Sequence, residues 1–226
     1  MKRLILVGMT VVTLAISRPS LAGIEYTDLS YDFGHVALDF TVIATYTLYN
    51  TGPDPVSIDS VRVNCDCSQA FAIDSLLQPG DTTTVRLSFT TTNFFGPNNK
   101  QLTVYTSDPK HPKINLFYLS VVGQWLNGIK PDPYAVFFLP PHKRKEIVIP
   151  NVKFDRIEIA LAGQVDTLYD VKVTRPRARK GESVAAEIVP RPGLRGGTYY
   201  SNLRLQIIPS DGDSVYLTIP VKIVRY

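Results

Sequence analysis

The stretch Phe40-Thr41-Val42-Ile43-Ala44-Thr45-Tyr46-Thr47-Leu48 alternates between apolar and mostly hydroxyl-bearing side chains. Because successive side chains of a β-strand point to opposite faces, the alternate apolar positions share one face and the threonines lie on the other. The same period of two recurs in residues 85–89, 203–207 and 215–223, whereas the sequence has no sustained helical periodicity. These runs predict half-buried β-strands.

Turn-forming residues separate the alternating runs. The clearest are Asn50-Thr51-Gly52-Pro53, Gln78-Pro79-Gly80-Asp81, Gly96-Pro97-Asn98-Asn99, Ser107-Asp108-Pro109 and Asp211-Gly212. Short strands divided by such turns are typical of antiparallel β-sandwiches. The fold class predicted from the sequence is therefore all-β.

The length of 226 residues predicts two domains of about 100 residues each. The boundary is expected near Gln124–Pro133, where Asn127-Gly128 and Pro131-Asp132-Pro133 interrupt the strand pattern. We therefore predict two consecutive immunoglobulin-like sandwiches, residues 23–124 and residues 125–226, after an N-terminal signal peptide.

Residues 1–22 have the three parts of a secretory signal peptide. Met1-Lys2-Arg3 is a positive start, residues 4–16 are mostly apolar, and Ser20-Leu21-Ala22 places small residues before Gly23. The apolar run is too short to span a bilayer, and the alternatives are an N-terminal anchor or a buried strand. Since the first cysteine is Cys65, we expect cleavage without a lipid anchor at that site. The expected product is a periplasmic or secreted protein with no transmembrane segment in the mature chain.

The charge balance argues against a nucleic-acid partner. The chain carries 24 basic and 20 acidic residues, and loss of Lys2, Arg3 and Arg18 with the signal peptide leaves 21 basic residues. A nucleic-acid-binding domain is expected to be strongly basic. Export makes such a partner still less accessible.

The two predicted domains differ in charge. Residues 23–124 carry five basic and ten acidic residues, whereas residues 125–226 carry sixteen basic and ten acidic residues. Electrostatic attraction between the domains is one expected consequence. The other is an anion-binding surface for an anionic lipid or glycan, made by Lys143, Arg144, Lys145, Arg175, Arg177, Arg179 and Lys180. These cations lie beside prolines and lack apolar alternation, which predicts exposed loops, and an ordinary solvated surface is the alternative.

The sequence lacks the common motifs of catalysis and metal binding. It has no glycine-rich phosphate loop, no His-Glu-x-x-His, no nucleophile elbow and no complete EF-hand loop. None of the three histidines, His35, His111 and His142, has a serine or cysteine at a sequence spacing that is typical of a catalytic nucleophile. The Asp-Gly pair within residues 210–214 predicts a hairpin rather than a calcium loop. We expect a protein that is not an enzyme and holds no metal or cofactor.

Asn64-Cys65-Asp66-Cys67-Ser68 is the one distinctive short motif. In an extended strand, the Cα atoms of Cys65 and Cys67 would lie about 6.5–7 Å apart, whereas a disulfide prefers about 5.5–6 Å. A bridge between them therefore requires a local bend. Four interpretations of the pair are compatible with the sequence: an inert or structural pair, a redox-active bridge, two thiolates that bind a soft metal such as Cu(I), and a covalent link to a partner.

Five motifs between residues 29 and 124 occur in a fixed order. They are Tyr31-Asp32-Phe33-Gly34, Tyr49-Asn50-Thr51-Gly52, Val61-x-Val63-x-Cys65-x-Cys67-Ser68, Leu77-Gln78-Pro79-Gly80-Asp81 and Thr106-Ser107-Asp108-Pro109. This succession resembles the bacterial domain-of-unknown-function 1573 family, which is similar to the immunoglobulin-like domains of the ASH and major sperm protein group. The chain departs from the family pattern at Asp66, Ser68, Asp81 and Ser107, where the family has Gly, Thr, Glu and Asn. The resemblance implies an immunoglobulin-like fold and export, and no catalytic residues.

These observations predict an exported, non-enzymatic β-sandwich protein that binds an envelope protein or a surface polymer through loops or edge strands. One alternative is a periplasmic chaperone-like protein with two immunoglobulin-like domains. It requires a long exposed edge strand and cationic residues between the domains, whereas the basic residues of this sequence cluster in the second domain. The second alternative is a thiol redox or Cu(I)-handling protein that uses Cys65 and Cys67.

Overall fold

The computed structural model describes residues 23–140, 143–163 and 166–226. The predicted signal peptide and His142 lie outside the described residues. The strands of the first half are β1 (Ile24–Tyr26), β2 (Ser30–Val36), β3 (Thr41–Asn50), β4 (Val56–Val63), β5 (Ser68–Ala72), β6 (Leu76–Leu77), β7 (Thr82–Thr90), β8 (Gly96–Thr106) and β9 (Lys113–Val122). After the 3-10 helix η1 (Leu126–Gly128) follow β10 (Val136–Phe138), β11 (Lys145–Pro150), β12 (Arg156–Leu161), β13 (Tyr169–Arg175), β14 (Arg177–Arg179), β15 (Ser183–Pro190), β16 (Gly197–Pro209) and β17 (Val215–Arg225).

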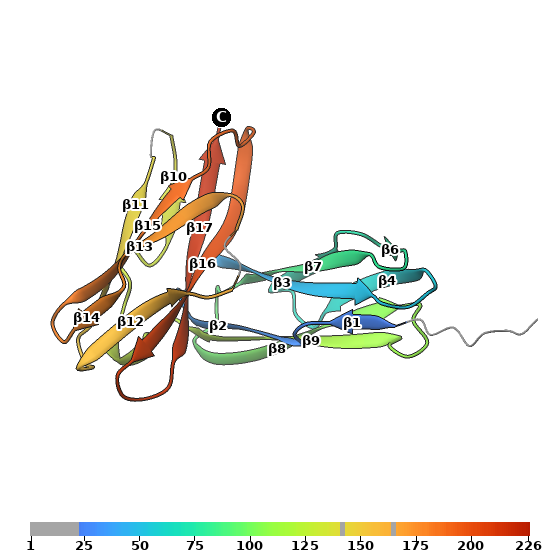
Figure 1. The fold of residues 1–226 in the computed structure, drawn as a ribbon, viewed down its shortest axis with the longest axis horizontal. Helices are drawn as coiled ribbons and strands as arrows, with labels where there is room; N and C mark the ends of the chain where they lie inside the picture. Colours follow the sequence, from blue (N-terminus) through green and yellow to red (C-terminus); the bar gives the residue numbers. More distant parts are fainter. Residues whose placement is uncertain (1–22, 141–142, 164–165) are drawn as a thin grey trace, which may run out of the picture.

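Three sheets build two sandwiches set at an angle to each other (Figure 1). In the first sandwich, a sheet in the order β1-β3-β7-β5 faces the strands β2, β9, β8, β4 and β6. In the second, a sheet in the order β11-β15-β13 faces β14, β12, β16, β17 and β10. Most pairings are antiparallel, so the prediction of all-β antiparallel sandwiches is confirmed.

The alternating runs become the buried faces of these sheets. In β3, Val42, Ala44, Tyr46 and Leu48 are buried, and the same alternation in β7, β16 and β17 supplies core residues at the predicted positions. The buried residues form two hydrophobic clusters, one within residues 24–122 and one within residues 129–223. The predicted hairpin at residues 210–214 joins β16 to β17.

One pairing joins the two sandwiches into a continuous sheet. Strand β2 lies between β9 and β17 and runs parallel to both, with His35 opposite Leu217 and Val36 opposite Thr218. Thr218, which alternation places on the polar face of its strand, is fully buried at this pairing, and its hydroxyl is satisfied by a 2.6 Å hydrogen bond that it donates to the backbone oxygen of Phe33. The sequence gives no sign of this contact.

The motif Tyr31-Asp32-Phe33-Gly34 shapes the joint. The Asp32 carboxylate accepts a 2.7 Å hydrogen bond from the backbone N–H of Gly34, and the register of β2 against β9 shifts between Asp32 and His35. Gly34 has φ +62°, and a Cβ atom at this position would lie 2.0 Å from the backbone oxygen of Tyr216. Only glycine combines this backbone conformation with so close an approach of β17.

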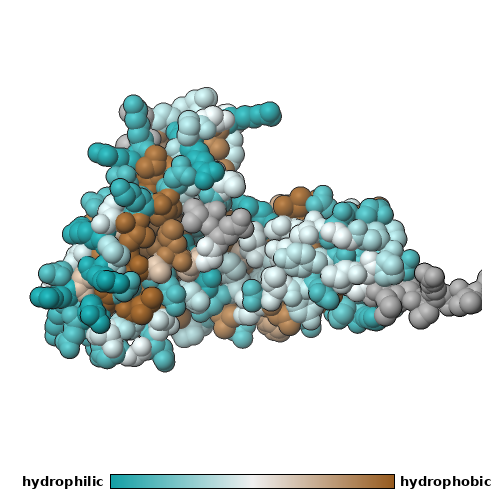
Figure 2. Space-filling view, viewed as in Figure 1, coloured by the Kyte–Doolittle hydropathy of each residue, from teal (hydrophilic) through white to brown (hydrophobic). Residues whose placement is uncertain are grey.

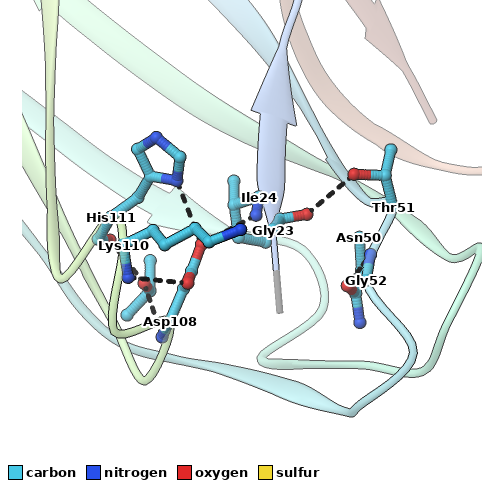
Figure 3. A network of polar contacts seen from close by, with 9 residues as sticks. Gly23, Ile24, Asn50, Thr51, Gly52, Asp108, Lys110 and His111 are labelled. Carbon is cyan, nitrogen blue, oxygen red and sulfur yellow. Dashed lines mark hydrogen bonds and ion pairs between the residues drawn. The ribbon is translucent and has the colours of Figure 1, made fainter. Parts of the chain in front are cut away.

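A buried carboxylate fixes the start of the first sandwich (Figure 3). Asp108 is fully buried and accepts hydrogen bonds from the backbone N–H groups of Ile24 at 2.8 Å and Lys110 at 2.9 Å. The His111 ring nitrogen Nδ1 lies 3.0 Å from the same carboxylate. Burial by itself raises the pKa of Asp108, but these hydrogen bonds outweigh it and hold the pKa below its ordinary value. The carboxylate therefore ties β1 to the loop before β9.

Candidate functional site

Two adjoining hollows lie in the cleft between the sandwiches. One, of about 280 Å³, is lined by Tyr31, Ile43, Thr45, Arg86, Ala162, Gly163, Asp166, Thr167, Tyr169, Ser201, Asn202, Leu203 and Arg204. The other, of about 580 Å³, is lined by Thr41, Ile43, Arg86, Ser88, Asp166, Thr167, Leu168, Thr198, Tyr199 and Tyr200. Strands β3 and β7 of the first sandwich and β16 of the second therefore form the cleft walls. We call this region the interdomain cleft.

Two hydrogen bonds cross the interdomain cleft. The backbone N–H of Ile43 donates to Asn202 Oδ1 at 2.6 Å, and Arg86 Nη2 donates to the backbone oxygen of Tyr200 at 3.0 Å. Arg86 points into the cleft because its neighbours Val85 and Leu87 occupy the core side of β7. These bonds add to the β2–β17 pairing and fix the distance between the walls.

Arg204 is one of the residues that line the smaller hollow. Its guanidinium carbon lies 3.7 Å from the centre of the Tyr216 ring and 4.8 Å from the centre of the Tyr31 ring, so the cation is held between two aromatic faces. Its Nε atom is buried and has no hydrogen-bond partner among the described residues. Burial raises the pKa of the Tyr31 phenol, and this effect outweighs the positive charge of Arg204, which by itself would lower that pKa. The phenol therefore remains neutral at physiological pH.

The second sandwich also contributes a carboxylate to the cleft. Asp166 Oδ2 accepts a 2.5 Å hydrogen bond from the buried Ser201 hydroxyl, and Asp166 Oδ1 accepts from the backbone N–H of Leu168 at 3.1 Å. Tyr169 is buried beside them, and its burial raises the pKa of its phenol. With Arg86 from the first sandwich and Arg204 from the second, the interdomain cleft offers both signs of charge beside tyrosine rings and hydroxyl groups. This composition suits a mixed polar and apolar ligand.

Sequence reasoning missed the interdomain cleft. Alternation could place Arg86 and Arg204 on outward faces of their strands, but only the fold brings arginines from both domains to one cleft. Most basic residues do lie in the second domain, as the sequence indicates, but the fold brings Arg86 and Arg204 to the junction between the domains.

Cys65 and Cys67 are joined by a disulfide, with their Cα atoms 5.2 Å apart. The bend that a bridge requires is present: the chain turns at residues 64–67, and Ser68 donates a backbone hydrogen bond to the Cys65 oxygen at 3.3 Å. The buried Ser68 hydroxyl lies 3.6 Å from Cys65 Sγ and 2.8 Å from the Tyr118 hydroxyl. Tyr118 packs against Phe89 in the first core, and Cys67 packs against the same core, so the disulfide lies against the hydrophobic interior of this sandwich.

Replacement of both cysteines by serine should lower the stability of the protein only modestly. The bridge closes a loop of three residues, for which chain entropy predicts about 1.6 kcal/mol of stabilisation. We expect a thermal shift of a few degrees in the double variant C65S/C67S and unchanged partner binding. Loss of a dithiol oxidation or Cu(I) binding activity that the parent protein possesses would contradict a purely structural role.

The seven cations of the candidate anion-binding surface do not form one uncompensated patch. Arg144 pairs with Glu187 at 3.6 Å, Arg175 with Glu146 at 3.8 Å, and Arg177 with Glu158 at 3.0 Å. The prediction of loops is wrong for most of the second stretch, because Arg175 ends β13 and Arg177–Arg179 form β14. Lys143, Arg144, Arg179 and Lys180 are exposed, and Lys145 begins β11.

The histidines singled out in the sequence do not come together in one site among the described residues. His35 Nδ1 lies 2.9 Å from the backbone oxygen of Gln124, and His111 belongs to the Asp108 network. Among the described residues, no three His, Cys, Asp or Glu side chains are grouped so that they could hold a metal ion. No helix in the described part of the chain is long and apolar enough to cross a membrane.

Outside the cleft, hydrophobic residues gather on the second domain over β12 and β13, whereas the same view of the first domain is mostly polar or neutral (Figure 2). Leu161 at the end of β12 is 37% exposed, and Val171 and Val173 of β13 are partly buried against the second core. These side chains cover the core at an open side of the sandwich.

The comparison with protein families confirms the resemblance of the first domain. The family model described as "Protein of unknown function (DUF1573)" matches residues 24–120. The match covers less than half of the chain and leaves the second domain outside it. No curated protein matches the chain.

Several solved structures are remotely similar. A PapD-like ASH domain of human CEP192 is 17% identical, with a TM-score of 0.37, over 53% of this chain and 99% of that chain. A protein of unknown function from Porphyromonas gingivalis is 13% identical, with a TM-score of 0.34, over 89% of this chain and 99% of that chain. The VesB protease of Vibrio cholerae is 10% identical, with a TM-score of 0.36, over 45% of this chain. The matched part spans about a third (32%) of the length of that protease.

Proposed function

We propose that this protein is an exported, non-enzymatic binding module that holds a segment of an envelope protein in its interdomain cleft. The observation that carries the proposal is the cleft itself: its walls come from both sandwiches, and the Ile43–Asn202 and Arg86–Tyr200 hydrogen bonds hold them together. A preformed site reduces the ordering cost that a ligand must offset on binding.

The lining of the cleft supports a protein ligand. Exposed Tyr200 and half-buried Ile43 offer apolar contact, Thr45 and Thr167 offer hydroxyl groups, and Arg86 offers a cation. A polypeptide carries all the complementary groups in one chain. A glycan would use the hydroxyls and the aromatic rings but would leave the Arg86 charge without a partner unless it were acidic.

Export is supported by two independent features. Residues 1–22 have the pattern of a signal peptide, and Cys65 and Cys67 form a disulfide, which persists in oxidising compartments. Protein from the envelope fraction should therefore begin at Gly23.

Photo-crosslinking from the cleft tests the proposed function. A photoreactive phenylalanine analogue at Thr45, which lines the cleft, should form a protein crosslink in living cells. The matched control places the same analogue at Thr103 on β8, outside the cleft. We expect a crosslink from position 45 only, and its loss in the Arg86→Ala background. A crosslink to a glycan, equal crosslinking from both positions, or no crosslink at all would contradict the proposal.

One observation favours the chaperone-like alternative as a second candidate. Such a protein needs cationic groups between its domains, and Arg86 and Arg204 supply them from different sandwiches. A chaperone would be found crosslinked to newly exported subunits that have yet to assemble. A binding module would be found crosslinked to a mature envelope protein.

A further inference from the structure

Strand β16 has an open edge where it borders the interdomain cleft. β16 spans Gly197–Pro209 and pairs with β17 over the range 197–207, but β12 covers its other side only at residues 205–209. No other described strand pairs with β16 over residues 197–203. Those residues supply Thr198, Tyr199 and Tyr200 to the larger hollow. A row of backbone groups therefore faces the cleft without a strand partner.

The direction of these backbone groups follows from two hydrogen bonds. The backbone oxygen of Tyr200 accepts from Arg86, and the backbone oxygen of Arg204 accepts from the N–H of Ala162, so both oxygens point away from β17. In an antiparallel ladder, the N–H and C=O of one residue point to the same side, and successive residues point to opposite sides. The N–H and C=O groups of Thr198 and Tyr200 therefore point into the cleft.

Arg86 occupies the edge in the free protein. Its guanidinium donates to the Tyr200 oxygen, and it forms no ion pair with a described acidic residue. A backbone N–H of an incoming strand would replace Arg86 at the Tyr200 oxygen. The displaced guanidinium would then lie beside that strand with its charge free to pair with a carboxylate.

We infer that a short extended segment of the partner protein adds to β16 as a new strand along residues 197–201, with an acidic side chain of that segment paired to Arg86. The inference rests on the proposed function and specifies how the cleft holds its ligand. Strand addition supplies affinity through main-chain hydrogen bonds, and flanking side chains supply selectivity. An unpaired strand edge presents a row of N–H and C=O groups that the backbone of another polypeptide strand can pair with.

Amide hydrogen exchange of the full mature chain tests the inference. In the free protein, the amides of Thr198 and Tyr200 should exchange much faster than those of Tyr199 and Ser201, which bond to β17. The probe is a peptide selected from a displayed library of random 12-residue sequences. Its addition should protect Thr198 and Tyr200, and the selected sequences should contain an acidic residue.

Two substitutions at one position provide a second readout. Tyr200→Ala keeps the outward N–H, whereas Tyr200→Pro removes it while the ladder with β17 loses no donor. We expect Tyr200→Pro to weaken peptide binding about tenfold relative to Tyr200→Ala, the equivalent of one hydrogen bond. Equal affinities, or binding that shifts Thr45 resonances without protecting Thr198 and Tyr200, would overturn strand addition and leave the proposed function standing. Failure to select any peptide, together with no protein crosslink from Thr45, would overturn both.

Discussion

Gly34→Ala should uncouple the two sandwiches and lower the stability of the protein by roughly 3–5 kcal/mol. A Cβ atom at Gly34 would lie 2.0 Å from the backbone oxygen of Tyr216 and 2.4 Å from its backbone carbon. Backbone atoms of a central strand cannot rotate away as a side chain can, so β17 must move. The expected losses are the pairing of His35 and Val36 with β17 and the hydrogen bond between Thr218 and Phe33.

A control substitution at Gly80 separates the effect of the steric clash at Gly34 from the effect of backbone strain. Gly80 also has a positive φ, +86°, but nothing lies within 4 Å of the position where its Cβ atom would stand. Gly80→Ala should therefore incur only the left-handed backbone cost of about 1–2 kcal/mol. Calorimetry should show one unfolding transition for the parent and for Gly80→Ala, and two transitions for Gly34→Ala. Equal destabilisation by the two substitutions would show that the joint is not held by the contact at Gly34.

Asp108→Ala should destabilise the first sandwich by about 3 kcal/mol, because it leaves the N–H groups of Ile24 and Lys110 buried without an acceptor. Asp108→Asn keeps an acceptor oxygen and should cost less. Asp28→Ala is the control, since Asp28 is exposed. Chemical denaturation at neutral pH measures all three. A loss for Asp108→Ala no larger than that for Asp28→Ala would contradict the role assigned to the network in Figure 3.

The same carboxylate predicts a dependence of stability on pH. Because the pKa of Asp108 is lower in the folded protein than its ordinary value of 3.8, folding favours the ionised form. The stabilisation is fully present above pH 3.8 and is lost as the pH falls through the lower pKa of the folded state. The difference in stability between the parent and Asp108→Asn should therefore shrink in strong acid. A constant difference from pH 6 down to pH 2 would contradict this assignment.

Local patterns predicted the strands and the β-sandwich architecture. The alternation of residues 40–48 predicted the buried face of β3 because one face of an antiparallel sheet is solvated and the other is packed. Disulfide geometry showed only that a bridge between Cys65 and Cys67 would need a bend, and the structure supplies both the bridge and the bend.

The joint and the cleft could not be predicted in this way. The parallel pairing of Val36 with Thr218 joins residues far apart in the sequence, and neither strand carries a local mark of it. From the sequence, Arg86 and Arg204 are expected only to be solvent-facing residues of alternating strands. Only the tertiary fold makes them neighbours across the interdomain cleft.

The charge asymmetry of the two domains has little part in the joint. Each of the ion pairs among the described residues forms within one sandwich, as in Arg177–Glu158 and Arg191–Asp170. The contacts that cross between sandwiches include three hydrogen bonds, the stacking of Arg204 on Tyr31, and the packing of the Phe40 ring against Tyr134 and Phe137. Exposed charges are screened beyond about 10 Å at 0.1 M salt. Small-angle scattering should therefore give the same overall dimensions at low and high salt.

The affinity of Gly34→Ala for the partner crosslinked at Thr45 tests most directly whether both sandwiches form one binding site. Gly34 does not line the interdomain cleft, so its substitution removes no ligand contact. The account predicts that Gly34→Ala, with both sandwiches still folded, loses at least tenfold in affinity, while Gly80→Ala binds as the parent does. Unchanged affinity in a Gly34→Ala protein whose sandwiches have separated would show that the partner binds one domain alone.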